Sequence, residues 1–307
     1  MGDTLREKPP PGEKYLEYRM KHFSIQAAPG FGHQLCNILC LIEEAKILGR
    51  IPILPLMLLP ALHNKGISGL TRYRKYLSFD ELQSQMELLF QEEVRSMQFD
   101  TAYHCELATT TEDLLPRDEQ LVIREFENWD FFDAADRFPF SLGAKDGTSR
   151  RWLNSFAYAR IQPSRRVSAL ADKLCPKLGP DYIGLHVRRG DRAVNAAWNQ
   201  ATSPEHIEQR LKKWVPPGKL IYILSDEADR DFFAPLSVHY EIRTSFDFPD
   251  LRVLVDEEND NFMLFAVESE IMRRSSFCIS TEYYKGPVLT AYSLLGPGDL
   301  PAPVYHN

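Results

Sequence analysis

The chain has 307 residues, of which 44% are hydrophobic and 26% charged, and its formal net charge at pH 7 is −7. This composition is typical of a globular protein, and the length predicts two domains of about 150 residues each. The negative charge argues against a protein that binds nucleic acid or lies on an anionic membrane, because both need a broad cationic surface. An anionic ligand must therefore be held by a local basic cluster.

Neither a membrane-spanning nor a secretory segment is predicted. The longest apolar run, 51–62, has twelve residues and three prolines, whereas a membrane span needs about 20 apolar residues. No basic segment followed by an apolar one opens the sequence, so we expect a cytoplasmic protein or, alternatively, an excised lumenal domain from the Golgi or ER. Five scattered cysteines form no disulfide framework. Cys36 and Cys40 lack further ligands nearby and are interpreted as core residues.

In chain order, a flexible arm over 1–14 is predicted to precede a strand–turn–helix–strand unit. The unit is expected at 22–27, 29–33, 35–45 and 51–54, with Gly49 ending the helix. A helix over 78–91 and a strand over 120–126 are predicted next. The aromatic stretch 126–140 is interpreted as packing.

From about position 161 onward, predicted strands and helices alternate. Strands are expected at 182–187, 220–224, 240–243 and 277–280, and helices at 164–178, from 203, and at 227–233, 261–273 and 288–295. This alternation predicts an α/β fold with parallel strands that binds its ligand at the carboxyl ends of those strands. The predicted domains are 1–160 and 161–307.

The sharpest motif follows the strand at 182–187 and reads His186-Val187-Arg188-Arg189-Gly190-Asp191. Two adjacent arginines at the end of a buried strand repel each other unless an anion lies between them. The planar guanidinium suits phosphate oxygens, Gly190 permits a tight turn, and Asp191 can hold one arginine in place. We interpret the motif as a phosphate site; a surface salt-bridge cluster is the alternative.

A second motif, Gly30-Phe31-Gly32-His33-Gln34, opens the first predicted helix, where free N–H groups can bind an anion. A plain strand-to-helix turn is the alternative. Two strand ends in the second half are also polar, and they carry Ser225 and Asp226, then Ser280 and Thr281. These side chains can hold phosphate, ribose and base or can cap helices, and their occurrence at one sheet edge favours a binding site.

The motif at 186–191 resembles the His-x-Arg-Arg-x-Asp peptide of the fucosyltransferase superfamily, which includes the protein O-, α1,6- and α1,2-fucosyltransferases. The turn at 30–34 is similar to the Gly-x-Gly-Asn-Gln peptide of that superfamily. The pair Ser225-Asp226 resembles its second motif, and 260–281 resembles its third. The resemblance implies a GT-B arrangement of two Rossmann-like domains facing across a cleft: an acceptor-side domain (1–160) and a nucleotide-sugar domain (161–307).

The resemblance also implies a metal-independent, inverting transferase that uses GDP-fucose and no further cofactor. On this resemblance the acceptor would be a hydroxyl of a glycan or of a protein Ser or Thr. Arg188 would hold the β-phosphate, Ser280 and Thr281 the phosphate oxygens, and Asp260, or else Asp226, the guanine edge. The residues expected to contact the donor are Gly30, Phe31, Gly32, His33, His186, Arg188, Arg189, Asp191, Ser225, Asp226, Asp260, Ser280 and Thr281.

One position departs from that superfamily, which usually has Asn where this chain has His33. A histidine can bind the donor in the same way, can serve as general base because its ordinary pKa is near 6.5, or can simply cap the turn.

Three alternative functions stay open: a GT-B transferase for another nucleotide-linked pentose or deoxysugar, a non-catalytic nucleotide-binding relative, and a Rossmann oxidoreductase. Leu35 disfavours the last, because the dinucleotide fingerprint requires glycine there.

Overall fold

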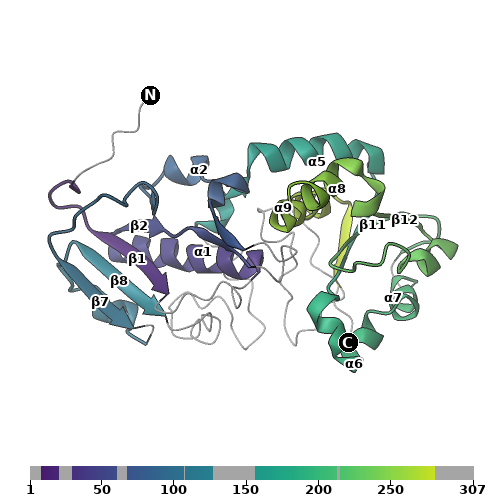
Figure 1. Ribbon diagram of the computed structural model, residues 1–307, viewed down its shortest axis with the longest axis horizontal. Helices are drawn as coiled ribbons and strands as arrows, with labels where there is room; N and C mark the ends of the chain where they lie inside the picture. The colour runs from purple at the N-terminus through teal and green to yellow at the C-terminus, as the bar shows by residue number, and fades with distance from the viewer. Residues whose placement is uncertain are drawn as a thin grey trace. The chain divides into compact units, whose positions relative to one another are not determined.

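The computed structural model describes residues 8–20, 30–60, 68–106, 108–126, 156–212 and 215–280. It confirms the predicted α/β class, with two parallel sheets (Figure 1). The chain divides into two compact units, Met1–Gln162 and Pro163–Asn307, and each is described by itself. The strand predicted at 22–27 and the helix predicted at 288–295 lie outside the described residues, as does nearly all of the aromatic stretch.

The N-terminal unit contains a five-stranded parallel sheet in the order β6-β2-β1-β8-β7. The strands are β1 (Tyr15–Met20), β2 (Ile51–Leu54), β6 (Leu89–Phe90), β7 (Ala102–Glu106) and β8 (Leu121–Phe126). Tyr15 is paired with Ile51 on one side and with Leu121 on the other. The predictions of β2 and β8 are confirmed, whereas β1 and β7 were not predicted.

The helix α1 (Phe31–Leu48) packs against β1 and β2. Leu35, Ile38 and Leu39 are fully buried on it, which is the helical spacing that the sequence shows. Gly49 ends the helix in the left-handed conformation with φ of 61°, as predicted, because glycine adopts positive φ without steric cost.

The helix predicted over 78–91 is wrong. Only α2 (Asp80–Gln83) is helical, and the Ser84 hydroxyl donates to the Glu81 carbonyl just after it. Phe79 and Phe90 are both buried with ring centroids 5.3 Å apart, whereas eleven residues of continuous helix would separate them by about 16 Å. Packing of the two rings in one core therefore requires the chain to turn.

Short elements complete the unit, and most have too few residues to show a period in the sequence. They are β3 (Met57–Leu59), β4 (Gly69–Thr71), η3 (Tyr73–Lys75), β5 (Leu77–Ser78), α3 (Thr111–Leu114), η6 (Tyr158–Arg160) and β9 (Gln162–Pro163). The strands β3 and β4 form an antiparallel pair, and β5 is paired with β9.

A fully buried ion pair joins α1 to β8. Both side chains, Glu44 and Arg124, are 0% exposed, and the shortest distance between Arg124 Nη2 and Glu44 Oε1 is 2.5 Å. Tyr18 and Thr111 donate hydroxyl hydrogen bonds of 2.5 and 2.9 Å to the same carboxylate. Arg124 also donates to the carbonyl of Thr109, at 2.6 Å. The network thus ties β1, β8, α1 and α3 together at one point.

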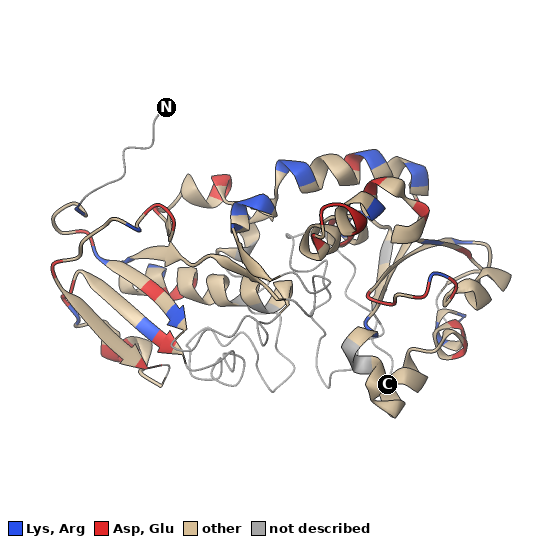
Figure 2. Ribbon diagram, viewed as in Figure 1, with Lys and Arg blue, Asp and Glu red and all other residues tan. Residues whose placement is uncertain are grey.

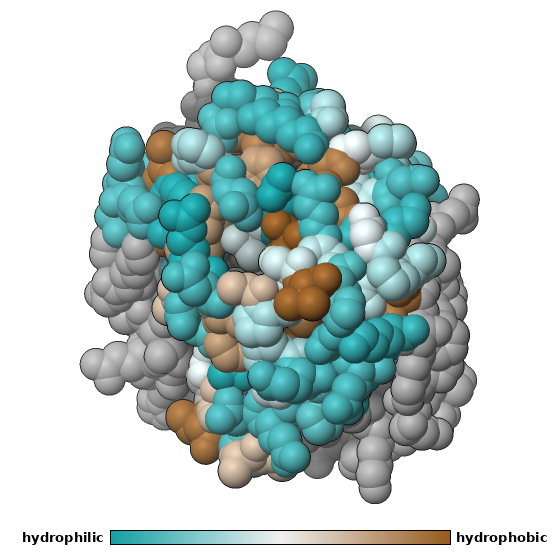
Figure 3. Space-filling model, turned by 90° about the vertical axis from the view of Figure 1, so that its right-hand side faces the viewer, coloured by the Kyte–Doolittle hydropathy of each residue, from teal (hydrophilic) through white to brown (hydrophobic). Residues whose placement is uncertain are grey.

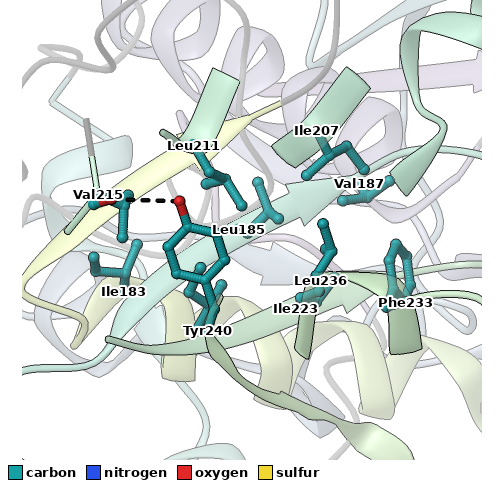
Figure 4. Close-up of a cluster of buried hydrophobic side chains, with 11 residues drawn as sticks. Ile183, Leu185, Val187, Ile207, Leu211, Val215, Ile223, Phe233, Leu236 and Tyr240 are labelled. Carbon is teal, nitrogen blue, oxygen red and sulfur yellow. Dashed lines mark hydrogen bonds between the residues drawn. The ribbon is translucent and has the colours of Figure 1, made fainter. Parts of the chain in front are cut away.

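The C-terminal unit contains a four-stranded parallel sheet in the order β12-β11-β10-β13. The strands are β10 (Ile183–Val187), β11 (Leu220–Ser225), β12 (Glu241–Thr244) and β13 (Phe277–Ser280). All four lie within one residue of their predicted bounds. Alternate residues of β10, starting at Ile183, pack into one hydrophobic cluster with Leu236 and Tyr240 (Figure 4). The Tyr240 hydroxyl donates to the Val215 carbonyl at 3.4 Å.

The helices of this unit are α5 (Arg165–Leu178), α6 (Ala196–Ala201), α7 (Pro204–Leu211), α8 (Pro249–Asp256) and α9 (Asn261–Arg273), with single 3-10 turns at η7 (Gly190–Val194), η8 (Ala234–Val238) and η9 (Ser245–Asp247). Ser203 caps α7 by accepting from the His206 amide, and Pro204 is its first residue, so the helix begins where the sequence predicts. The bounds of α5 and α9 agree with prediction, whereas α6 and α8 were not predicted.

The helix predicted over 227–233 is wrong for a local reason. The Glu227 carboxylate accepts from the Asp229 amide, and the Asp229 carboxylate accepts from the Asp231 amide, both at 3.0 Å. Acidic side chains that capture amides two residues ahead compete with the helical hydrogen bonds. The segment therefore forms successive turns.

Surface ion pairs connect α5 to α8 and to the end of α9. Lys173 lies 2.7 Å from Asp250, and Arg274 lies 2.5 Å from Asp172; Figure 2 shows several lysines and arginines along α5. In the space-filling view of Figure 3, hydrophilic side chains cover most of the described surface, and hydrophobic ones lie singly or in small groups. This is the ordinary pattern of a water-exposed surface.

A carboxyl group is buried between α9 and β11. Glu268 is 3% exposed and accepts a 2.8 Å hydrogen bond from the Tyr222 hydroxyl. Burial raises its pKa from 4.5 to about 8. The folded protein therefore binds a proton that the unfolded chain releases, so stability decreases as pH rises from 4.5 through about 8.

We expect Glu268→Gln to be more stable than the wild type at pH 8 by a few kcal/mol, because the amide carries no charge to desolvate. At pH 4 the two proteins should differ little. Urea unfolding between pH 4 and 9 measures the difference, with Glu257→Gln, at an exposed carboxylate after α8, as the control. A stability gap that does not grow with pH contradicts the prediction.

No helix among those described is both long and apolar enough to cross a membrane.

Candidate functional site

The motifs of the C-terminal unit meet at one edge of its sheet. Because β10, β11 and β13 are parallel, their carboxyl ends lie at the same edge. Val187 is paired with Ser225, and His186 is paired with both Leu224 and Ser280. Segments separated by about forty and ninety positions in the sequence are therefore neighbours here, as the sequence predicted.

Arg188 emerges at this edge, directly after β10. Its side chain is 26% exposed, and its Nη1 donates to Asp226 Oδ2 at 2.7 Å. Trp198, on α6, donates its indole N–H to the Arg188 carbonyl at 2.7 Å. A partly exposed guanidinium on a well-anchored backbone is suited to receive an anion from solvent.

The carboxylate of Asp226 lies against the turn that follows the arginines. Its Oδ1 accepts from the Arg189 amide at 2.7 Å. A Cβ atom added to Gly190 would lie 2.4 Å from Oδ2 of Asp226, so only glycine lets this carboxylate approach. The tight turn expected at Gly190 thus serves a close contact between two chain segments.

Arg189 is buried and its guanidinium is engaged inside the unit. Its Nε donates to Glu227 at 2.7 Å, and its Nη2 donates to the Asn199 side-chain oxygen at 2.8 Å. Nη1 donates to the hydroxyl of Thr202 at 3.0 Å, and the ring of Phe232 lies 4.0 Å from the guanidinium. The two arginines therefore differ: Arg188 faces the edge, and Arg189 holds α6 and β11 together.

Ser225 also bonds within the unit. Its hydroxyl donates to the Val187 carbonyl at 2.8 Å and accepts from the Glu227 amide at 3.1 Å. The segment Ser225-Asp226-Glu227 therefore fastens the end of β11 to the arginine segment. The sequence assigned Ser225 and Asp226 to the donor, whereas the described contacts of both go to the protein.

His186 lies on the side of β10 opposite the hydrophobic cluster and is 7% exposed. Burial and the neighbouring charge of Arg188 lower its pKa to about 4. The imidazole is therefore neutral at pH 7. It can shape the edge beside Ser280, but it adds no positive charge to it.

Asp260 caps the first turn of α9. It is 3% exposed, and its Oδ1 accepts from the Met263 amide at 2.9 Å. The end of α9 leads within a few residues to the start of β13, so its first turn lies toward the edge where the strands end. The assignment of Asp260 to the guanine base stays a prediction.

The glycine motif in the N-terminal unit opens α1. Gly30 is the N-cap residue in an extended conformation, and as a glycine it has no side chain that could accept from the first amides of α1. Phe31 is 3% exposed, with its ring 5.6 Å from that of Tyr76, and it is therefore a core residue. His33 lies in the first turn of α1.

Gln34, which completes that motif, has a role that the sequence analysis did not assign. Its side-chain nitrogen donates to the Leu58 carbonyl at 2.8 Å, and its oxygen accepts from the Leu58 amide at 2.7 Å. The Tyr73 hydroxyl donates to the Gln34 carbonyl at 3.2 Å. These two buried hydrogen bonds between Gln34 and Leu58 fix the start of α1 against β3. The only sequence signal for this role of Gln34 is its position within the glycine motif.

The other predicted site groups lie outside the part of the chain that the structure describes. They are the side chains of His33, Asp191 and Ser280, and the whole of Thr281. Within the described ranges, no group of three or more His, Cys, Asp and Glu side chains is placed to hold a metal ion. Besides Gln34, two residues of this edge were not predicted from the sequence: Glu227, which binds Arg189, and Trp198, which binds the Arg188 carbonyl. Glu227 could have been found because it directly follows Asp226, whereas the sequence holds no signal for Trp198.

The fold is shared with solved fucosyltransferases. The NodZ fucosyltransferase from Bradyrhizobium superposes with a TM-score of 0.52 at 13% identity, covering 93% of each chain. NodZ α-1,6-fucosyltransferase soaked with GDP-fucose gives 0.51 at 13% identity over the same shares. A single-residue mutant of Arabidopsis thaliana FUT1 in complex with GDP gives 0.52 at 11% identity, covering 87% of this chain and 65% of FUT1.

No protein-family model matches the sequence, and no curated protein matches it. The class defined by the structural likeness is therefore a fucosyltransferase-like α/β fold. The resemblance drawn from the short motifs is confirmed at the level of that fold.

Proposed function

We propose that the protein is a glycosyltransferase that moves fucose from GDP-fucose to a hydroxyl of a glycan or of a protein Ser or Thr. The observation that carries this proposal is Arg188, a partly exposed guanidinium at the carboxyl edge of a parallel sheet. The solved structures of this fold include one soaked with GDP-fucose and one in complex with GDP, which supports the choice of donor.

In the proposed reaction the acceptor oxygen attacks the anomeric carbon of fucose from the face opposite GDP, and the configuration inverts. The bond between that carbon and the β-phosphate oxygen breaks, and its electron pair stays on the diphosphate. Arg188 stabilises this developing charge, which is the role that a metal ion plays in other transferases. The acceptor hydroxyl loses its proton during the attack.

We assign the removal of that proton to His33, at the start of α1. The neutral His186 is the less suitable base, because its burial, together with the charge of Arg188, lowers its pKa to about 4. In this proposal Gly30, Gly32 and His33, at the start of α1, and the pair Ser280–Thr281 contact the donor, whereas Phe31 packs in the core. Residues 161–307 form the nucleotide-sugar domain in this proposal, and residues 1–160 form the acceptor-side domain.

Calorimetry with GDP, GDP-fucose and UDP tests the proposal directly. We expect binding of GDP and GDP-fucose, weaker binding of UDP by tenfold or more, and slow release of GDP from GDP-fucose without acceptor. Preference for UDP would instead support a transferase of another nucleotide sugar. Tight GDP binding without any GDP release would support a non-catalytic relative, and binding of none of the three would contradict the proposal.

A further inference from the structure

Asp226 meets the arginine segment at three points. Its Oδ2 accepts from Arg188 Nη1, and its Oδ1 accepts from the Arg189 amide, both at 2.7 Å. The third point is the close approach to Gly190, where an added Cβ would lie 2.4 Å from Oδ2 and 2.9 Å from the carboxyl carbon. Both carboxylate oxygens are therefore used within the protein, by groups of one short segment.

The carboxylate is itself held in place. Asp226 directly follows β11, whose last residue, Ser225, is paired with Val187 and hydrogen-bonded to its carbonyl at 2.8 Å. The next residue, Glu227, binds the guanidinium of Arg189 at 2.7 Å. The anchors on either side hold the backbone at Asp226 in place, and Gly190 limits the room for its side chain on one side.

We propose that Asp226 is a positioning residue that aims the guanidinium of Arg188 and makes no contact with the nucleotide base. A free arginine side chain samples many rotamers, and ordering it is entropically unfavourable. A fixed carboxylate orders it before the ligand arrives, so that binding loses less entropy. The inference rests on the proposed function, because a diphosphate is the ligand for which Arg188 is aimed.

A double-mutant cycle of GDP affinity, measured by calorimetry, separates positioning from base contact. We expect Arg188→Ala to weaken GDP binding by about 10- to 100-fold and Asp226→Ala by about tenfold. Asp226→Asn, which retains one acceptor, should fall between Asp226→Ala and the wild type. In the Arg188→Ala background, Asp226→Ala should change the affinity by less than about twofold, because its effect passes through Arg188.

Losses that multiply in the double variant overturn the inference, because they show that Asp226 contacts the nucleotide itself. Glu241→Gln is the matched control: it removes a carboxylate from an exposed pair with Arg243 on the neighbouring strand β12, and it should bind GDP as the wild type does. Gly190→Ala keeps every charge but displaces the Asp226 carboxylate, so it should weaken GDP binding as much as Asp226→Ala. It takes the place of Asp226→Ala in the cycle if Asp226→Ala does not fold.

Crystal structures of the nucleotide-free wild type and Asp226→Ala give a readout that does not depend on the ligand. We expect the Arg188 guanidinium to leave its wild-type position in the variant, while α6 and Arg189 stay in place. An unmoved Arg188 overturns the inference. If the wild type binds no GDP, the proposed function fails on that result alone, and the crystal structures still decide whether Asp226 aims Arg188.

Discussion

Replacing Arg188 by alanine is expected to reduce fucose transfer by more than about 100-fold, because the departing diphosphate loses the group that stabilises its charge. Arg188→Lys keeps the charge but loses the planar fork, so it should recover only part of the activity. Turnover of GDP-fucose, measured as GDP release with and without acceptor, provides the comparison.

Arg243→Ala is the control for this experiment, since it removes an exposed arginine paired with Glu241 on β12 of the same sheet. Its turnover should equal that of the wild type. Near-normal turnover of folded Arg188→Ala would remove the basis of the proposed function, because that function assigns the stabilisation of the departing diphosphate to Arg188.

The second large effect concerns stability. Glu44→Leu leaves the fully buried Arg124 without its carboxylate, and it also removes the acceptor of the Tyr18 and Thr111 hydroxyls. Loss of one partner of a buried ion pair costs about 3–5 kcal/mol, so we expect the free energy of unfolding to fall by that amount. Urea denaturation of the wild type and the variant measures it.

The double variant Glu44→Leu/Arg124→Met should recover much of the lost stability, because no unpaired charge then stays buried. Asp118→Asn is the control: Asp118 is 95% exposed in its pair with Lys14, and exposed pairs contribute about 0–1 kcal/mol. A loss for Glu44→Leu no larger than that of Asp118→Asn would show that the buried network contributes little to stability.

Long periodic elements could be predicted from the sequence, and short or interrupted ones could not. Val167, Ala171 and Leu174 recur at helical spacing and are buried on α5, and a serine cap followed by proline begins α7, so local sequence defines both helices. In contrast, α2 ends because Phe79 and Phe90 pack in one core, and the turns after Glu227 replace a helix because acidic side chains bind nearby amides. The first case depends on a partner eleven residues away, which a local pattern does not encode.

The candidate site shows the same division. The local sequence determined that two arginines follow a buried strand and that a glycine comes next, and it thereby predicted an anion site at a strand end. Only the tertiary structure decided that Arg188 faces the edge while Arg189 is buried among Glu227, Asn199 and Thr202. Adjacent residues in extended chain point to opposite sides, and which side is interior depends on the elements that pack there.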